Sequence, residues 1–355
     1  MNDRVVDDIV GWLPPLLQAV EALQFVARHL HPPGFDAVME AIGQPDSALQ
    51  DARAGLGEWP ADFTDLRQQL DAASDAARAG IAGLRAAQQP GGDIVAVFRA
   101  LRDLPRAQEA LYAAATRLPP VSAFFLPPAL REDAALAERL AQPAAEATGV
   151  MHGGPPGARG GFSLYVPEYY VPDRAWPLVV ALHGGSGNGR AFLWSWLADA
   201  RARGAIVIAP TAVGSTWALM GDDPDTPNIA GILDIVQARY NIDASRRLFS
   251  GMSDGGTFCY ISGLRADSPF THLAPVCATF HPLLAQFADA DRVRGLPIRI
   301  VHGRRDWMFP VQTARDARDA LAVAGADVDY REIDDLSHCY PREVNAELLD
   351  WLGGC

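Results

Sequence analysis

The chain has 355 residues, of which 49% are hydrophobic and 21% are charged, a balance typical of a globular protein with an apolar core. Its formal net charge of −13 argues against a nucleic-acid partner and against an anionic membrane surface, because both require a basic face. Neutral or small substrates remain open.

Residues 1–148 are rich in alanine, and their apolar residues recur at helical spacing. One series follows Pro14 and Pro15, which suit the first turn of a helix: Leu16, Val20, Leu23 and Ala27. Proline and glycine clusters divide this half into about five helices. We predict an all-α N-terminal domain that performs no chemistry and acts as a cap or as a dimerisation surface.

The first residues are acidic, and Pro14 and Pro15 interrupt the apolar stretch that a signal peptide would need. No apolar run approaches the roughly 20 residues of a membrane span, so we expect none. These features favour a cytoplasmic protein, although a mature chain whose leader had been removed would read the same.

Residues 149–355 alternate short apolar segments with helical stretches, which predicts a mostly parallel sheet with helices on both faces. An earlier piece, TGVMHGG, adds an antiparallel edge strand to this prediction. In such sheets the chemistry collects at the carboxyl ends of the strands. The expected strands are FSLYVP, PLVVALHG, AIVIAP, RRLFSG, LAPVCATF, IRIVHG and VDYREI.

One of these strand ends carries a serine between glycines, in the stretch Gly251-Met252-Ser253-Asp254-Gly255. A lone Gly-x-Ser-x-Gly is also typical of an ordinary glycine turn. The apolar strand before it and the helix-like GTFCYISGL after it favour a tight turn that holds out a nucleophilic hydroxyl. Flanking glycines leave room for such a turn.

Two later strand ends supply the partners that a serine nucleophile needs, namely a base and an acid that orients the base. Asp306 follows IRIVHG, and His338 follows the last strand. The chain order of serine, aspartate and histidine is the one that this scaffold uses. Asp334 and Asp335 are alternatives to Asp306, but their closeness to His338 favours a solvated loop.

Other polar and aromatic residues near the strand ends receive lesser roles. We interpret His183 as a brace for the glycine-rich turn that contains Gly185 and Ser186, and His302 as a brace for the loop that carries Asp306. Three side chains in loops at the catalytic end are predicted to contact substrate: Trp217, His281 and Trp307.

Neither a metal nor an organic cofactor is expected. The stretch GDDPDT, with Asp222, Asp223 and Asp225, lacks the spacing and the terminal glutamate of a calcium-binding EF-hand loop, so a solvated loop is favoured. The four cysteines form no C-x-x-C pair and are predicted to be free, mostly buried thiols: Cys259, Cys277, Cys339 and Cys355.

From residue 149 to 355 the chain resembles an α/β-hydrolase, similar to bacterial carboxylesterases of the phospholipase/carboxylesterase and polyhydroxybutyrate-depolymerase/feruloyl-esterase-like branches. The matching pieces are GGFSLYVPEYY, PLVVALHGGSGNG, YNIDASRRLFSGMSDGG, VHGRRDWMFP and LSHCYP. The resemblance implies that Ser253 is the nucleophile, Asp306 the acid and His338 the base. The implied oxyanion hole consists of backbone N–H groups of Asp254 and of Gly185 or Ser186.

These features together predict a serine carboxylesterase that cleaves a small-molecule or polymeric ester through an acyl-enzyme. A serine peptidase or a thioesterase would use the same chemistry on the same scaffold. A non-catalytic interaction protein is the alternative from a different class. Acyl length, the alcohol and the oligomeric state, including a homodimer, are not indicated.

Overall fold

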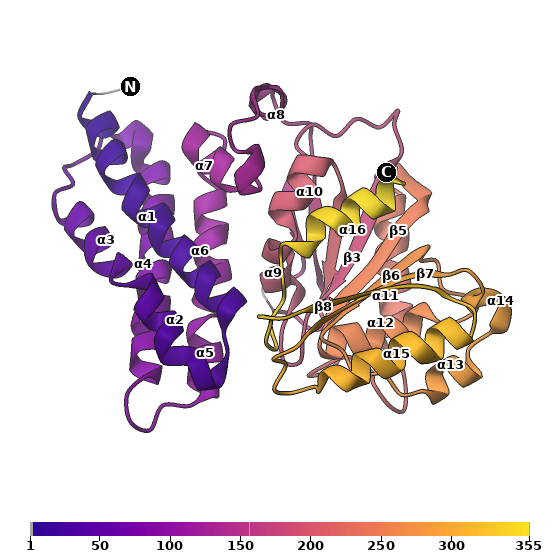
Figure 1. The fold of residues 1–355 in the computed structure, drawn as a ribbon. Coiled ribbons are helices and arrows are strands. Elements are labelled where there is room, and N and C mark those ends of the chain that lie inside the picture. Colours follow the sequence, from indigo (N-terminus) through magenta and orange to yellow (C-terminus); the bar gives the residue numbers. More distant parts are fainter. Residues whose placement is uncertain (1–2, 156, 355) are drawn as a thin grey trace. The chain divides into compact units, whose positions relative to one another are not determined.

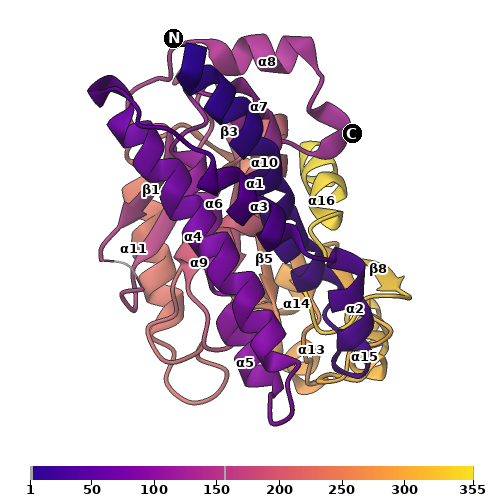
Figure 2. The same ribbon diagram turned by 90° about the vertical axis from the view of Figure 1, so that its left-hand side faces the viewer.

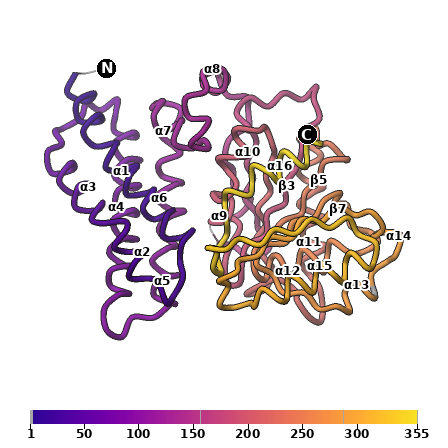
Figure 3. The backbone as a smooth tube through the Cα atoms, viewed as in Figure 1, coloured from indigo at the N-terminus to yellow at the C-terminus, as the bar shows by residue number. Residues whose placement is uncertain are grey.

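The computed structural model describes residues 3–155 and 157–354, so Cys355 lies outside the described residues. The chain forms two compact units that divide between Arg131 and Glu132. Figure 3 traces the backbone through both. Each unit is a separate body with its own core.

The first unit is helical throughout, as the sequence predicted. Short breaks such as Gly43–Gln44 separate more helices than the five expected before residue 149. Its long helices α1 and α4 pack against each other (Figures 1 and 2). The α-helices of this unit are α1 Asp3–His29, α2 Phe35–Ile42, α3 Pro45–Ala54, α4 Thr64–Ala87, α5 Ile94–Ala100, α6 Asp103–Tyr112 and α7 Pro119–Phe124.

Pro14 and Pro15 lie inside α1, so the prediction that they begin a helix is wrong. Each proline removes a backbone N–H and leaves the carbonyl four residues earlier, on Val10 or Gly11, without its helical donor. Both residues are exposed, so water can reach these carbonyls. The helix continues because its opposite face packs against α3 and α4 through buried side chains that include Trp12, Leu16, Val20 and Leu23.

By length and composition alone, α1 could cross a membrane, whereas the sequence analysis predicts no membrane span. In the structure, Trp12 is fully buried, and its indole N–H donates to the Ser74 hydroxyl on α4 at 3.0 Å. Helix α1 therefore serves as a core helix of the first unit.

The second unit is built on an eight-stranded sheet with the order β1-β2-β4-β3-β5-β6-β7-β8. β2 pairs antiparallel with β1 and with β4, and all the other pairs are parallel. The predicted mostly parallel sheet and its antiparallel edge strand are thus confirmed. The strands are β1 Gly149–Gly153, β2 Phe162–Val166, β3 Trp176–Leu182, β4 Ile206–Pro210, β5 Ile242–Met252, β6 His272–Val276, β7 Pro297–Gly303 and β8 Asp327–Ile333.

Helices cover both faces of this sheet (Figure 1). Helices α11, α12 and α15 share one apolar core with the sheet, whereas α10 and α16 pack together on the other face. This arrangement confirms the predicted α/β-hydrolase fold class. The helices are α8 Ala134–Ala141, α9 Gly189–Phe192, α10 Leu197–Arg203, α11 Asp225–Gln237, α12 Asp254–Gly263, α13 Leu283–Phe287, α14 Ala290–Val293, α15 Val311–Val323 and α16 Val344–Gly353.

The division between the units comes earlier than the predicted boundary after residue 148, because α8 belongs to the second unit. The Arg139 guanidinium lies 4.1 Å from the centroid of the Tyr169 ring. The Ala145 N–H donates to the Glu168 carbonyl at 3.2 Å. The alanine-rich composition ends where the strands begin, near Gly149. The segment from residue 132 to 148, however, already makes its contacts within the second unit.

Candidate active site

Ser253 lies at the sharp turn between β5 and α12. Its backbone has φ 56° and ψ −121°, a conformation that residues other than glycine rarely adopt. The Ser253 N–H donates to the Val276 carbonyl on β6 at 2.9 Å, which anchors the strained residue to the sheet. Strain of this kind, about 1–3 kcal/mol, clusters at functional sites.

The glycines around Ser253 are required by close packing. A Cβ at Gly251 would lie 2.5 Å from the Gly255 backbone, and one at Gly255 would lie 2.5 Å from the His183 carbonyl oxygen. A Cβ at Gly256 would lie 2.8 Å from the Cβ of Ala278. Positions 251, 255 and 256 are glycines because the packing of the turn leaves no space for a Cβ at any of the three.

The structure brings Ser253, His338 and Asp306 into one hydrogen-bonded chain. His338 Nε2 lies 3.0 Å from Ser253 Oγ, and His338 Nδ1 lies 2.8 Å from Asp306 Oδ2. A proton on Nδ1 lets Nε2 accept from the serine hydroxyl, which is the tautomer that a general base needs. All three residues are buried, with at most 9% of their surface exposed.

Asp306 is held as a carboxylate by several donors. Its Oδ1 accepts the N–H groups of Met308 at 2.9 Å and Phe309 at 2.8 Å, while Oδ2 faces His338. Burial by itself would raise the pKa of this carboxyl, but the hydrogen bond and charge of His338, the Phe309 N–H and His302 outweigh it. The pKa of Asp306 is therefore lower than that of an ordinary aspartate.

The alternative acid Asp334 lies elsewhere. Its Oδ1 accepts from Arg304 at 2.9 Å, and its side chain is 82% exposed. A solvated ion pair of this kind suits a surface loop, as the sequence indicated for this aspartate.

The glycine-rich loop that contains Gly185 and Ser186, predicted to supply the oxyanion hole together with Asp254, lies against the serine turn. A Cβ at Gly184 would lie 3.6 Å from the Cβ of Ser253, and one at Gly185 would lie 2.7 Å from Asp254 Oδ2. Asp254 begins α12, and the first N–H groups of a helix have no partner within it, which favours negative charge. Ser186, the next residue of the loop, has a positive φ of 58°.

His183 ties this loop to the segment that follows β4. Its Nε2 accepts the Ala212 N–H at 3.1 Å, so the ring proton lies on Nδ1, which donates to the Gly184 carbonyl at 2.7 Å. The His183 carbonyl accepts from the Trp217 indole at 2.7 Å. Burial lowers the pKa of His183 to about 4, which keeps the ring neutral.

The predicted substrate contact at Trp217 is wrong. Its side chain is 2% exposed and its ring stacks on Phe258 at 5.4 Å between centroids. The indole belongs to the core and supports the loop of residues 183–186 through the His183 carbonyl. Trp307, by contrast, is 41% exposed, and its ring centroid lies 6.4 Å from that of His338. Trp307 therefore lies at the same end of the sheet as His338.

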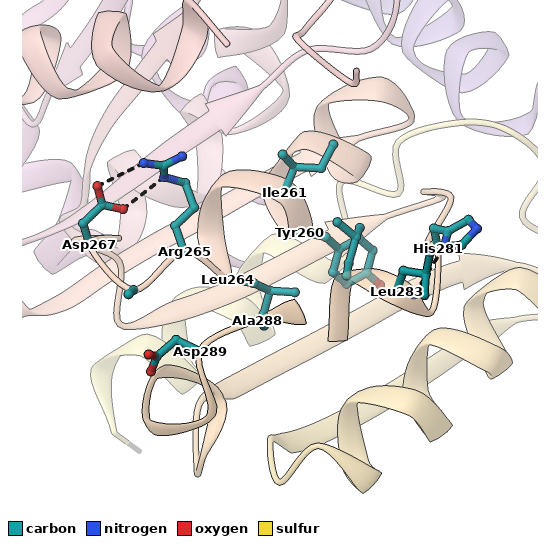
Figure 4. A pocket seen from close by; sticks show the side chains of 11 residues that line it. Tyr260, Ile261, Leu264, Arg265, Asp267, His281, Leu283, Ala288 and Asp289 are labelled. Atoms are coloured by element: carbon teal, nitrogen blue, oxygen red, sulfur yellow. Dashed lines mark hydrogen bonds and ion pairs between the residues drawn. The ribbon is translucent and has the colours of Figure 1, made fainter. Parts of the chain in front are cut away.

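His281 lines a cavity of about 770 Å³ between α12 and α13 (Figure 4). An ion pair between Arg265 and Asp267 lies at the other end in this view. The segment before His281 is held near α12, because the Thr279 N–H donates to the hydroxyl of Thr257 in that helix at 3.1 Å. Apolar side chains make up much of the lining: Ile261, Leu264, Leu283, Leu284 and Ala288.

No sequence motif marks Thr216, yet its hydroxyl donates to Asp254 Oδ2 at 2.5 Å beside the serine. The loop that carries Thr216 is anchored by Asp225, whose carboxylate accepts the N–H groups of Val213 at 2.7 Å and Ala218 at 2.8 Å. Asp225 is 1% exposed, so the prediction of a solvated loop is wrong for this residue. The neighbouring aspartates in GDDPDT suggested a solvated loop, whereas the Asp225 carboxylate is buried and holds the loop in place.

Within residues 3–155 and 157–354, no group of three or more His, Cys, Asp or Glu side chains is placed to hold a metal ion. Cys259 and Cys277 are free thiols, and all three described cysteines, which include Cys339, are buried, as predicted. Burial raises the pKa of the Cys259 and Cys277 thiols, so neither is a reactive thiolate.

No protein-family model matches the chain. A bifunctional acetylxylan esterase/xylanase of Neocallimastix patriciarum is 30% identical over 216 residues, which are 56% of this chain and 29% of that protein. A probable feruloyl esterase C of Aspergillus terreus is 33% identical over 116 residues, which are 31% of this chain and 43% of that protein. The chain thus matches less than half the length of either curated relative.

Among solved structures, the crystal structure of a thermostable esterase matches with a TM-score of 0.43 and 26% identity, covering 55% of this chain and 58% of that one. In the second unit itself, the strand order and the serine at the β5–α12 turn define an α/β-hydrolase fold. The chain has this fold and is similar in sequence to two esterases.

Proposed function

We propose that the protein is a serine hydrolase that cleaves carboxylic esters, with Ser253, His338 and Asp306 as its catalytic triad. The observation that carries this proposal is the hydrogen-bonded chain from Ser253 Oγ through His338 to Asp306, with distances of 3.0 Å and 2.8 Å. Similarity to an acetylxylan esterase/xylanase and to a probable feruloyl esterase supports esters as the substrate class.

The geometry suits a two-step acyl transfer. His338 Nε2 takes the hydroxyl proton while Ser253 Oγ bonds to the carbonyl carbon, and the carbonyl oxygen becomes an oxyanion. The N–H groups of Asp254 and of Gly185 or Ser186 stabilise this charge. The imidazolium then protonates the departing alcohol, which leaves an acyl-serine. His338 next deprotonates water, which attacks the acyl carbon, and the proton returns to Ser253 as the acid leaves.

Substrate contacts are proposed at the two predicted side chains that remain candidates. Trp307 is exposed beside His338, and His281 lies at one end of the apolar cavity along α12. Acetylated xylan and feruloyl esters are the first substrates to test, given the names of the relatives. Matching thioesters and amides separate an esterase from a thioesterase or a peptidase.

The triad is tested by fluorophosphonate labelling and by steady-state kinetics on a short activated ester. Ser253→Ala is expected to abolish labelling. Ser253→Ala, His338→Ala and Asp306→Asn are each expected to lower kcat by roughly 10⁴-fold, because triad members act as a unit. The double change of Ser253 and His338 should be scarcely worse than either single change.

Matched controls come from the same elements. Ser245→Ala changes an exposed serine of β5, and Asp334→Asn changes the rival acid, so both should keep the normal rate. Labelling that persists in Ser253→Ala contradicts the proposal. A large loss of rate in Asp334→Asn, with a normal rate in Asp306→Asn, moves the acid role.

A further inference from the structure

His302 is a fully buried imidazole on β7 that the reaction scheme above does not use. Its Nε2 lies 2.9 Å from the Phe309 carbonyl oxygen, which can only accept, so Nε2 carries the proton and donates. The same nitrogen lies 3.5 Å from Asp306 Oδ2, the oxygen that faces His338. His302 therefore directs one N–H toward the loop and the acid of the site.

The loop from residue 304 to 310 is closed by a pair of linked hydrogen bonds. The Phe309 N–H donates to Asp306 Oδ1 at 2.8 Å, and the Phe309 carbonyl accepts from His302. The Phe309 ring lies edge-on to the His338 ring, with 5.1 Å between centroids. A shift of Phe309 would therefore move both the acid and the surroundings of the base.

The charged and titratable groups around His302 are Asp306, His338 and, from β8, Glu332. Glu332 is paired with Arg315 at 2.9 Å, so its charge is largely satisfied by that partner. Burial lowers the pKa of His302, which favours the neutral ring. Its Nδ1 has no hydrogen-bond partner among the described residues. A neutral donor holds the Phe309 carbonyl without adding a charge that would compete with the imidazolium of His338.

We propose that His302 is a positioning residue of the hydrolase reaction, whose Nε2–H fixes the Phe309 carbonyl and thereby the Phe309 N–H that holds Asp306 Oδ1, so that Asp306 Oδ2 faces His338 Nδ1. This inference rests on the proposed function of the triad. Without the Nε2–H, the Phe309 carbonyl loses its donor and the Phe309 N–H holds Asp306 Oδ1 less firmly. The bond from Asp306 to His338 then weakens, and the imidazolium is less stabilised. The apparent pKa of the base then falls.

The test compares His302→Leu, which removes the donor, with His302→Gln, which keeps an N–H at a similar reach. On an activated acetate ester, His302→Leu is expected to lower kcat by about 10- to 100-fold, with KM unchanged, because small misplacements cost this much. The acid limb of kcat/KM should move to lower pH. His302→Gln should recover most of the rate and restore the limb.

Fluorophosphonate titration counts competent sites, so kcat is expressed per reactive serine even if part of the sample misfolds. His272→Leu is the matched control, because it removes a partly buried strand imidazole that contacts Trp351 away from the triad. It should lower stability and leave the acid limb in place.

The outcomes separate this inference from the proposed function. A wild-type chain without Ser253 labelling or ester hydrolysis would sink the proposed function itself. With an active wild type, unchanged kcat and an unchanged acid limb in His302→Leu overturn the positioning role. The role is also overturned if His302→Leu and His302→Gln lose stability and rate together while the limb stays fixed.

Discussion

At the residue scale, His183 shows how a buried neutral imidazole joins two loops. One nitrogen donates to the Gly184 carbonyl, and the other accepts the Ala212 N–H. The ring thus links the loop of residues 183–186, the proposed oxyanion loop, to the segment after β4. Protonation would turn the accepting nitrogen into a donor aimed at a backbone N–H. The bond to Ala212 therefore exists only while the ring is neutral.

This requirement makes stability depend on pH. The pKa of His183 is about 4 in the folded chain, against an ordinary 6.5, so the unfolded chain takes up the proton first as pH falls. Its contribution is fully present above pH 6.5 and is lost toward pH 4, at up to about 3 kcal/mol. Denaturant unfolding across this window should show the slope, and His183→Gln should remove that part of it.

The comparison variant is His281→Gln, which changes an exposed imidazole whose Nδ1 accepts the Leu283 N–H at 3.2 Å. Because this bond is exposed to water, His281→Gln should change the slope much less than His183→Gln does. His302 and His272 also have a pKa lowered by burial, so some slope in the same direction should persist in His183→Gln. An identical slope in wild type and His183→Gln would show that the ring does not stay neutral through burial.

At the element scale, the β5–α12 turn depends on small residues at fixed positions. Gly255 lies in the first turn of α12, where its Cα packs against the backbone of Leu182 and His183 at the end of β3. Gly231 lies inside α11 with open space around it. A Cβ would therefore collide with backbone atoms at Gly255 and would meet open space at Gly231.

Alanine at these two positions should therefore act in opposite directions. Gly255→Ala places a Cβ 2.5 Å from the His183 carbonyl, and such overpacking costs about 1–3 kcal/mol of unfolding free energy. It should also lower kcat, because Ser253 and the oxyanion loop meet there. Gly231→Ala should raise stability by up to about 1 kcal/mol through helix propensity, with kcat unchanged.

Chemical denaturation and kinetics on the same short ester measure both effects. Equal stability changes in the two variants would mean that the close approach at Gly255 relaxes without cost. A normal kcat in a destabilised Gly255→Ala variant would separate the packing of the turn from the chemistry of Ser253.

At the scale of the whole molecule, the residues proposed to carry out the chemistry all belong to one of the two compact units. Every residue of the proposed triad and oxyanion hole lies in the unit that begins at Glu132. The helical unit has its own core around Trp12 and α4. We propose that the helical unit tunes access to the site as a cap, or forms a dimer surface, and performs no chemistry.

Two truncated chains test the boundary and this role. A chain that starts at Glu132 keeps the Arg139–Tyr169 contact and the Ala145–Glu168 hydrogen bond, whereas one that starts at Gly149 loses both. The first should be more stable by about 1–2 kcal/mol in thermal or denaturant unfolding. Both should cleave a short activated ester and react with a fluorophosphonate.

The role of the helical unit appears in the substrate range. Relative to the full chain, the chain that starts at Glu132 should show altered rates on longer or bulkier esters. Identical rates across the whole ester panel would contradict a cap, and an unchanged oligomeric state by light scattering would contradict a dimer surface. Equal stability of the two truncated chains would place the boundary at Gly149 after all.

Signals that depend on residues close in sequence were sufficient to predict much of this protein. Alternating strands and helices indicated the sheet, and Gly251, Ser253 and Gly255 indicated the tight turn, because each pattern expresses a local backbone requirement. The order of Ser253, Asp306 and His338 at strand ends then pointed to one edge of the sheet. Parallel strands bring their carboxyl ends together, so sequence order alone implied that these side chains would meet.

Other properties were decided only by contacts between distant parts of the chain. Trp217 donates to a carbonyl 34 residues earlier, so its loop position in the sequence concealed a place in the core. The buried Asp225 anchors a loop by accepting backbone N–H groups, and α8 joins the second unit through Arg139 and Tyr169. Pro14 and Pro15 stay helical because the face opposite them is buried. Burial is a property of the assembled chain, and a local pattern does not encode which loop, helix or carboxylate will be enclosed.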